Sequence, residues 1–423
     1  MAYDLLRVGP EREVPSLKPA WMRWAVLSVV MVGGGAFHVV RFWPAGEPTG
    51  TLWFWSCVVA LPFAAWAIAF LIYLGVLQTA RQRVIDFNAA RDEYLAQVVR
   101  DGGVPLHVLA SGFVFSTDAT ENSAHAITQR QLVLEPLPRF EGDSESVPAR
   151  WIKPDGQAWR PGNDRADEER HREVLPYVLS TLIDQVASTL HGLPDRTPVK
   201  IRLCAATLLG KLEVESCWRR AVASRQLGAL DNTDIGTTAP DIVEVDQWVE
   251  GRGIATDAVT LLCIVQLNAV LNAQPPEGSS EAGVILLLAP ASFATKKRLA
   301  SQVWLFRPER RSVRDIGQGL RQALLWSRVQ NADIADQWLT GRTDGALNKA
   351  LMHHLTEQSV GVMETKNFAG QHDIDLRIGA AGIASGWLCV SLALEHAVAS
   401  GKAQLCTVAS AEHLTIAVAV PRP

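Results

Sequence analysis

The sequence predicts a membrane-anchored α/β protein, and three observations support this class. Two long runs without a charged residue lie near the N-terminus, at Trp24–Val40 and Leu52–Leu77. Helix-like and strand-like patterns then alternate along the rest of the chain, which is typical of layered α/β domains. One strand candidate, Gly283–Leu288, is apolar throughout, as strands buried on both faces are.

The two apolar runs predict a transmembrane hairpin. A membrane helix needs about 20 apolar residues; the second run exceeds this length, and the first reaches it when Trp21–Trp43 is counted. The link between them, Pro44–Thr51, is short enough to force a hairpin. Tryptophans gather near the ends of the runs, as an aromatic belt requires. A secretory signal peptide fits less well, because a second span follows the first and no cleavage site is evident.

Basic residues on either side of the hairpin predict its orientation. They lie before the first run and after the second, and the loop between the runs holds only Arg41 at its edge. By the positive-inside rule, both termini and the soluble domain are expected in the cytoplasm, in a two-pass inner-membrane protein. The basic residues used are Arg7, Arg12, Lys18, Arg81, Arg83 and Arg91.

The soluble part is expected to contain two α/β lobes after a helical stalk. The predicted first lobe contains a polar, irregular insertion near residues 116–172, with a short strand at Gln131–Leu134. Further along, the patterns favour a strand at Asp241–Val245, a helix at Asp257–Asn272, a helix at Ile383–Ser400 and two closing strands. The predicted divisions are a cytoplasmic tail 1–20, the hairpin 21–78, the stalk 79–103, the first lobe 104–280 and the second lobe 281–423.

Composition excludes several classes of site. The formal net charge of −4 argues against a nucleic-acid-binding protein, which would carry a basic surface. The six cysteines form no CxxC pair, and reduced buried thiols are the simplest interpretation. The sequence contains neither zinc-ligand spacing nor a phosphate-binding loop, so no metal and no cofactor are expected.

A glycine-containing motif near the C-terminus resembles one in a known fold. Residues 378–386 read Ile378-Gly379-Ala380-Ala381-Gly382-Ile383-Ala384-Ser385-Gly386, and a helix and a β-hairpin follow. In spacing this resembles the I-G-H-x-x-x-A-S-G motif of the β-ketoacyl synthases, within the thiolase-like fold. Residues 337–345 would then correspond to the H-G-T-G-T segment of that family. The resemblance implies a layered α/β domain made of two similar lobes.

The catalytic groups of that family are missing at the matching positions. Ketosynthases use a cysteine nucleophile at a helix N-terminus and two histidines, whereas this chain has Ala380 at one histidine position and Trp338 or Leu339 at the other. Neither replacement can supply an imidazole hydrogen bond. Cys263 falls roughly where the nucleophile helix is expected, but its apolar neighbours indicate a buried thiol. No catalytic residue is therefore assigned, and the chain is not expected to be an enzyme.

The whole pattern also resembles the type VI secretion lipase adaptor family. The shared features are a two-helix anchor, a soluble part rich in tryptophan and alanine, and a degenerate thiolase-like C-terminus. The resemblance implies a non-enzymatic adaptor that binds a lipase toxin in the cytoplasm and helps load it on the secretion spike. Trp151 and Trp159 in the insertion are the predicted partner-binding residues, because aromatic residues contribute strongly to interfaces; packing against the domain is the alternative for both. The thiolase-like resemblance is also compatible with a homodimer or a pseudo-dimer of the two lobes.

Two other functions remain open at this point. One is membrane-associated acyl transfer, with Cys263 or Cys389 as nucleophile, although a thiol without a positioned base is usually inert. The other is a transporter or channel subunit, which the lack of a polar stripe in the spans disfavours. Two further polar pairs, His353–His354 and Asp373 with Asp375, are interpreted as an exposed helix face and a solvated turn.

Overall fold

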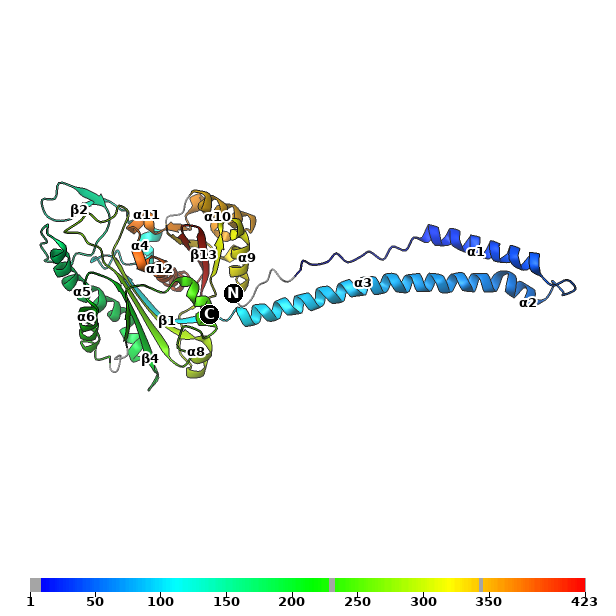
Figure 1. Ribbon diagram of the computed structural model, residues 1–423, viewed down its shortest axis with the longest axis horizontal. Helices are drawn as coiled ribbons and strands as arrows, with labels where there is room; N and C mark the ends of the chain where they lie inside the picture. The colour runs from blue at the N-terminus through cyan, green and yellow to red at the C-terminus, as the bar shows by residue number, and fades with distance from the viewer. Residues whose placement is uncertain (1–8, 228–232, 342–344, 423) are drawn as a thin grey trace. The chain divides into compact units, whose positions relative to one another are not determined.

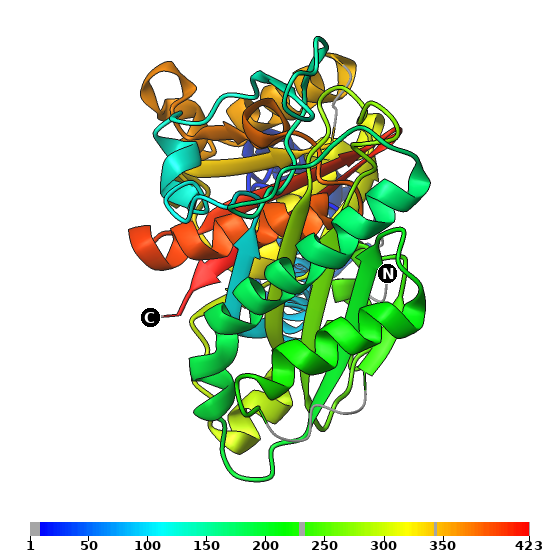
Figure 2. The same ribbon diagram turned by 90° about the vertical axis from the view of Figure 1, so that its left-hand side faces the viewer.

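The computed structural model describes residues 9–227, 233–341 and 345–422, in two compact units that divide between Val98 and Val99. Arg7, used above for orientation, and residues 342–344 of the segment that corresponds to H-G-T-G-T lie outside the described residues. Figures 1 and 2 give two perpendicular views.

Both predicted spans are helical. Helix α1 covers Trp21–Phe42; the second span begins with α2 (Leu52–Trp55), passes through a π-helical turn (Ser56–Ala60) and continues as α3 (Leu61–Gly102). Both helical segments are long and apolar enough to cross a membrane. Helix α3 runs on to Gly102 without a break, so the predicted stalk is the same helix as the second span.

Aromatic residues and one glycine hold the hairpin together. The ring of Trp24 lies 5.2 Å from that of Phe70, and the indole N–H of Trp66 donates to the Trp24 carbonyl at 3.0 Å. A Cβ added to Gly35 would lie 2.5 Å from Pro62 Cγ, so only glycine allows this approach. Small residues at a helix contact are typical of membrane helix pairs.

The soluble unit contains one long mixed sheet in the order β11-β10-β12-β13-β8-β1-β7-β6-β4-β5. Its N-terminal half consists of β1 (Leu106–Val114), β4 (Val199–Ala206), β5 (Thr233–Gly236), β6 (Val259–Gln266) and β7 (Ala282–Pro290). Its C-terminal half consists of β8 (Val303–Leu305), β10 (Asp336–Thr340), β11 (Gln371–Asp373), β12 (Gln404–Ser410) and β13 (His413–Pro421), and β9 (Glu309–Ser312) pairs with β13.

The two halves share one topology. Numbered along the chain within its own half, each half has the strand order 3-2-4-5-1. In each, the second strand pairs in parallel with the third and fourth, and the fifth is antiparallel to the fourth. The halves join through antiparallel pairing of β1 with β8. The soluble unit is therefore a structural duplication.

Helices cover the sheet in layers, as Figure 1 shows. On the N-terminal half, α5 (Asp164–His191) and α6 (Lys211–Ala223) bury one apolar cluster against the sheet. On the C-terminal half, α9 (Ile316–Ser327) and α10 (Gly345–Glu357) bury another. Between them, α12 (Ser385–Ser400) packs against both halves in a central cluster. This is the α/β layering that the thiolase-like resemblance implied.

Helix α12 is apolar because it lies in this central layer. Its segment Gly382–Ser400 has the length and hydropathy of a membrane span, but 56% of the tested window is buried within the soluble unit. The helix ends at Gly401, whose φ of 68° suits glycine and whose N–H donates to the Ala397 carbonyl.

Among the elements predicted above, the apolar strand β7, helix α12 and the final hairpin are confirmed. Three are wrong. Residues 257–272, predicted as a helix, form strand β6 and a loop. The predicted strand Asp241–Val245 is a short 3-10 turn that leads into α7 (Val245–Val249). The predicted strand Gln131–Leu134 is not a strand. The irregular insertion also ends earlier than predicted, because α5 begins at Asp164.

Candidate functional site

The degenerate motif forms a tightly packed turn before α12. It follows α11 (Asp375–Ile378), and a Cβ added to Gly379, whose φ is +90°, would lie 2.7 Å from the Ser279 carbonyl oxygen. The Ala380 N–H donates to the Gly278 carbonyl at 2.7 Å, and the Ser280 N–H donates to the Ala380 carbonyl at 2.9 Å. Gly386 packs against Ile242, 3.1 Å from an added Cβ. Close packing thus explains Gly379 and Gly386, and Ser385 is the first residue of α12.

Of the two residues at the second histidine position, Trp338 belongs to the core, whereas Leu339 is half-buried and lines a cavity. Trp338 in β10 is fully buried, and its indole N–H donates to Gln404 Oε1 at 3.0 Å. Just beyond it, the Asp375 carboxylate accepts from Thr340 Oγ1 at 2.7 Å and from the Gly341 N–H at 2.9 Å. Asp375 therefore anchors the end of β10. Asp373 accepts from the Leu376 N–H at 3.1 Å, and burial raises the pKa of its carboxyl.

The two candidate nucleophiles are buried and poorly placed. Cys263 lies in the middle of strand β6, fully buried, and not at a helix N-terminus as expected. Cys389 lies inside α12, where its Sγ is 3.4 Å from the Trp338 carbonyl oxygen. Burial raises the pKa of both thiols, which disfavours the reactive thiolate. Among the residues that the structure describes, no histidine nitrogen is hydrogen-bonded to a cysteine sulfur.

The duplication shows why a nucleophile helix is missing from the N-terminal half. Helix α12, of 16 residues, connects the third and fourth strands of the C-terminal half. The matching connection in the N-terminal half, between β5 and β6, contains only the 3-10 turn and the five-residue helix α7. Residues 237–258 contain no cysteine. An extended helix with a thiol at its N-terminus is therefore lacking between the described strands β5 and β6.

Two histidines meet one carboxylate in a cluster that the sequence analysis missed. Asp336 Oδ1 lies 2.9 Å from His372 Nε2, and Asp336 Oδ2 lies 3.3 Å from His396 Nε2. The Trp338 ring packs against both imidazoles, with centroid separations of 4.6 Å and 5.6 Å. Burial raises the pKa of the Asp336 carboxyl, but hydrogen bonds from the two histidines outweigh it and hold that pKa well below its usual range. The cluster ties α12 to β10 and β11.

Asp336→Asn is expected to destabilise the soluble unit by about 1–3 kcal/mol at neutral pH, because it removes a charged hydrogen-bond acceptor. A carboxyl whose pKa is lowered by folding stabilises the protein above its unfolded pKa of about 4, and the effect is lost as the pH falls further. Urea unfolding from pH 7 down to pH 3 should therefore show the gap between wild type and variant closing below about pH 4. A gap that stays constant over this range would contradict the assignment.

The histidine pair His353–His354 is on the surface of α10, as expected. His354 Nδ1 lies 2.8 Å from Glu357 Oε2. The ligating atoms of His353, His354 and Glu357 all lie within 4.8 Å of one another, so this group could hold a metal ion. The prediction that no metal binds therefore stays untested.

The two candidate partner-binding tryptophans differ in exposure. Trp159 is only 9% exposed, and its ring lies 4.7 Å from the Arg170 guanidinium, which is itself paired with Glu281. Trp159 therefore packs against the domain, which was the alternative interpretation. Trp151 is half-buried and lines a cavity of about 380 Å³ in the insertion.

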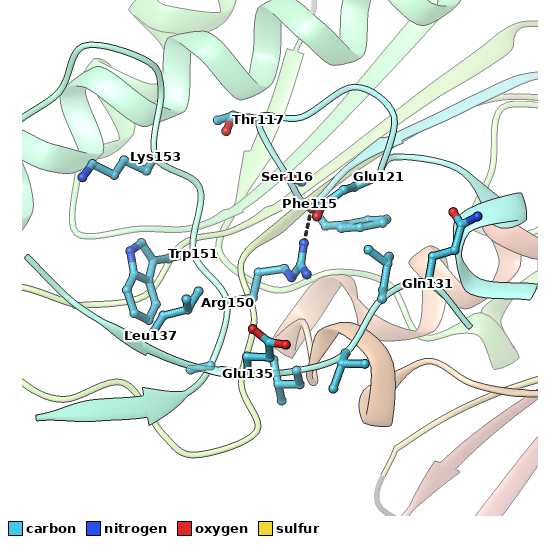
Figure 3. A pocket seen from close by; sticks show the side chains of 14 residues that line it. Phe115, Ser116, Thr117, Glu121, Gln131, Glu135, Leu137, Arg150, Trp151 and Lys153 are labelled. Carbon is cyan, nitrogen blue, oxygen red and sulfur yellow. Dashed lines mark hydrogen bonds and ion pairs between the residues drawn. The ribbon is translucent and has the colours of Figure 1, made fainter. Parts of the chain in front are cut away.

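This cavity is one candidate site among the described residues (Figure 3). Arg150 points into it and pairs with Glu121 at 2.5 Å, and the ring of Phe115 lies 5.9 Å from its guanidinium carbon. Trp151 and Leu137 form one side, and Lys153 lies near the rim. The cavity lining is mainly polar, with charged groups beside a few apolar side chains.

The cavity lies close to the degenerate motif. The Arg150 N–H donates to the Ser279 carbonyl, and the Glu281 N–H donates to the Arg150 carbonyl, both at 3.0 Å. Ser279 in turn forms a parallel β-bridge with Ala380. The insertion is therefore joined to the Ala380 turn through residues 279–281.

Comparison with known proteins supports the fold alone. No family model and no curated protein matches the sequence. The ketosynthase of module 6 of the Bacillus subtilis 168 bacillaene synthase is 10% identical, with a TM-score of 0.51 over 75% of this chain and 70% of that one. A module 1 ketosynthase of the bacillaene synthase from Bacillus amyloliquefaciens FZB42 is 13% identical, with a TM-score of 0.47 over 75% of this chain and 76% of that one. The ishigamide ketosynthase/chain length factor is 13% identical, with a TM-score of 0.45 over 75% of this chain and 100% of that one. Taken with the duplicated 3-2-4-5-1 sheet, the first of these similarities shows that the soluble unit has the thiolase-like α/β fold of the ketosynthases.

Proposed function

We propose that this chain is a membrane-anchored adaptor that binds a protein partner and has no acyl-transfer activity. One observation carries the proposal: the thiolase-like core is kept, while the described positions that would supply a thiol or an imidazole hold a cysteine buried in a strand, an alanine, and a tryptophan or leucine. Ala380 is fixed in a backbone turn, Trp338 is buried, and Cys263 lies within a strand. A thiolase-like fold that lacks the catalytic thiol and imidazoles still has broad surfaces that can bind a partner.

The partner follows from the family resemblance. We propose a lipase toxin as the bound protein and the spike of a type VI secretion system as the structure that receives it. The N-terminal hairpin would hold the adaptor in the inner membrane, with the soluble unit in the cytoplasm, where the spike is assembled. The distribution of basic residues around the hairpin supports this orientation.

The absence of acyl transfer is tested by thiol reactivity. When the purified full chain is incubated with cerulenin or an acyl-CoA donor, we expect no adduct at Cys263 or Cys389. Labelling should be at least about 100-fold slower than in guanidinium-unfolded chain, because burial suppresses the thiolate. Peptide mass spectrometry reads out each cysteine, and the unfolded sample is the control. A stoichiometric acyl adduct on one cysteine of the folded chain would favour the enzyme instead.

The adaptor role is tested by co-purification. Full-length tagged chain, extracted from host membranes in mild detergent, is expected to retain a lipase, and mass spectrometry should identify it together with a spike protein. An untagged strain is the control. Recovery of the chain alone, or only as a homodimer, would count against the adaptor role.

A further inference from the structure

Exposed apolar side chains gather at one end of the soluble unit. Val133 is 56% exposed and Leu137 43% exposed in the insertion, Leu137 lying in strand β2 (Pro136–Pro138). Phe368 is 49% exposed and Leu376 70% exposed in the C-terminal half. In Figure 1, β2 and α11 both lie at the upper end of this unit, and Figure 2 also shows the insertion and the 360–380 region at one end. Large exposed apolar residues in one place indicate an interaction site more than the same residues scattered singly.

These side chains line two neighbouring cavities. Val133 and Leu137 line the cavity of the insertion, whereas Phe368 and Leu376 line a second cavity of about 260 Å³. The two cavities meet where Arg377 Nη1 donates to the Leu132 carbonyl at 3.4 Å. We name this surface, from Val133 and Leu137 through Leu376 to Phe368, the insertion face.

The backbone of the insertion face is held in uncommon conformations. Asn367 and Phe368 have φ of 55° and 52°, and Arg130 has φ of 56°. A positive φ is costly for a bulky side chain such as phenylalanine, and such strain gathers at functional sites. Here the positive φ falls on Phe368, whose side chain is half exposed. This observation is independent of the apolar composition of the surface.

Besides His372, the charged residues that line the two cavities are four basic, Arg130, Arg150, Lys153 and Arg377, and three acidic, Glu121, Glu135 and Asp373. Arg130 and Arg377 line the second cavity and Lys153 lines the first, and no ion pair is seen for any of the three in the described part of the chain. The acidic side chains are largely engaged: Glu121 pairs with Arg150 and Asp373 accepts the Leu376 N–H. Glu135 is the exception. A complementary partner would therefore supply carboxylates beside its apolar groups.

We propose that the insertion face is the docking surface for the partner, and that the docking segment of the partner is apolar and acidic. The proposal rests on the adaptor function above and specifies where and by what chemistry it acts. Apolar side chains of the partner would fill the two cavities around Trp151 and Leu376. Its aspartates or glutamates would pair with Arg130, Arg377 and Lys153, which would set the register of docking.

A double variant with a matched control tests the surface. Leu376→Asp with Arg130→Glu places negative charge on the insertion face at two exposed positions. Leu212→Asp with Lys211→Glu makes the same changes on α6, where Leu212 is 80% exposed. We expect the first pair to lower recovery of the co-purified partner at least 10-fold, and the second pair to leave it within about 2-fold of wild type. Circular dichroism spectra of both variants should match wild type.

A photo-crosslinking amino acid at Val133 or Phe368 in the full chain then tests the chemistry. We expect crosslinks to the co-purified protein, in a segment rich in apolar residues, aspartate and glutamate. A basic segment, or a second copy of this chain, would overturn the proposal. If wild type retains a partner and the Leu376–Arg130 variant retains it equally, the insertion face is wrong while the adaptor role stands. If wild type retains no protein, both fail together.

Discussion

Replacing Glu281 with glutamine is expected to destabilise the soluble unit by about 3–5 kcal/mol, because it leaves a buried guanidinium without its counter-charge. Arg170 and Glu281 are both fully inaccessible and form two hydrogen bonds, of 2.7 Å and 2.6 Å. Glu281 also accepts the N–H of Ile152 at 2.9 Å and of Asn268 at 2.8 Å. The pair therefore joins α5, the residue before β7, the insertion and the loop after β6.

The measurement is the denaturant midpoint of full-length chain in detergent, followed by tryptophan fluorescence. Glu169→Gln is the matched control: Glu169 is an exposed partner of Arg165 on the same helix, and its loss should cost less than about 1 kcal/mol. A double change, Arg170→Met with Glu281→Leu, should be milder than Glu281→Gln, since it removes both buried charges. A Glu281→Gln variant as stable as the control would contradict this account.

Most apolar strands and helices could be predicted from the sequence, because their patterns are local. Strand β7 is a continuous apolar run, and the helix and hairpin after Ser385 have clear periodicity. Local pattern alone also explains why the segment around Cys263 is wrongly predicted as a helix, although it forms strand β6. Its run is apolar on both faces, because β6 contacts the outer cluster through Leu261 and Cys263 and the central cluster through Leu262 and Ile264. Periodicity alone cannot distinguish such a strand from a buried helix.

The features that escaped prediction depend on residues far apart in the sequence. Trp159 was expected to be exposed, but it covers a buried ion pair whose acid lies more than 100 positions away. The Asp336–His372–His396 cluster joins three separate elements. The duplication is likewise visible in strand order but not in residue repeats. By contrast, the alanine at position 380, where the resembled motif has histidine, is read directly from the sequence.

Trp387→Ala is the second substitution expected to have a large effect, about 3–5 kcal/mol of lost stability. Trp387 is buried in α12, and its ring stacks on that of Trp248 in α7, with centroids 5.6 Å apart and an interplanar angle of 15°. Its indole N–H also donates to the Pro240 carbonyl at 2.7 Å. Alanine would remove both contacts and leave a cavity in the central layer.

Two further substitutions separate these contributions by the same denaturation assay. Trp387→Phe keeps an aromatic ring but leaves the Pro240 carbonyl unpaired, so a smaller loss of about 1–3 kcal/mol is expected. Trp151→Ala, at a half-buried position in the cavity wall, should cost less than either. Because α7 is the short counterpart of α12, the Trp248–Trp387 stack is the main aromatic contact through which the shortened connection packs on the central helix. If Trp387→Ala proved no more destabilising than Trp151→Ala, the shortened connection would contribute little to the core, and the placement of α7 against α12 would need to be reconsidered.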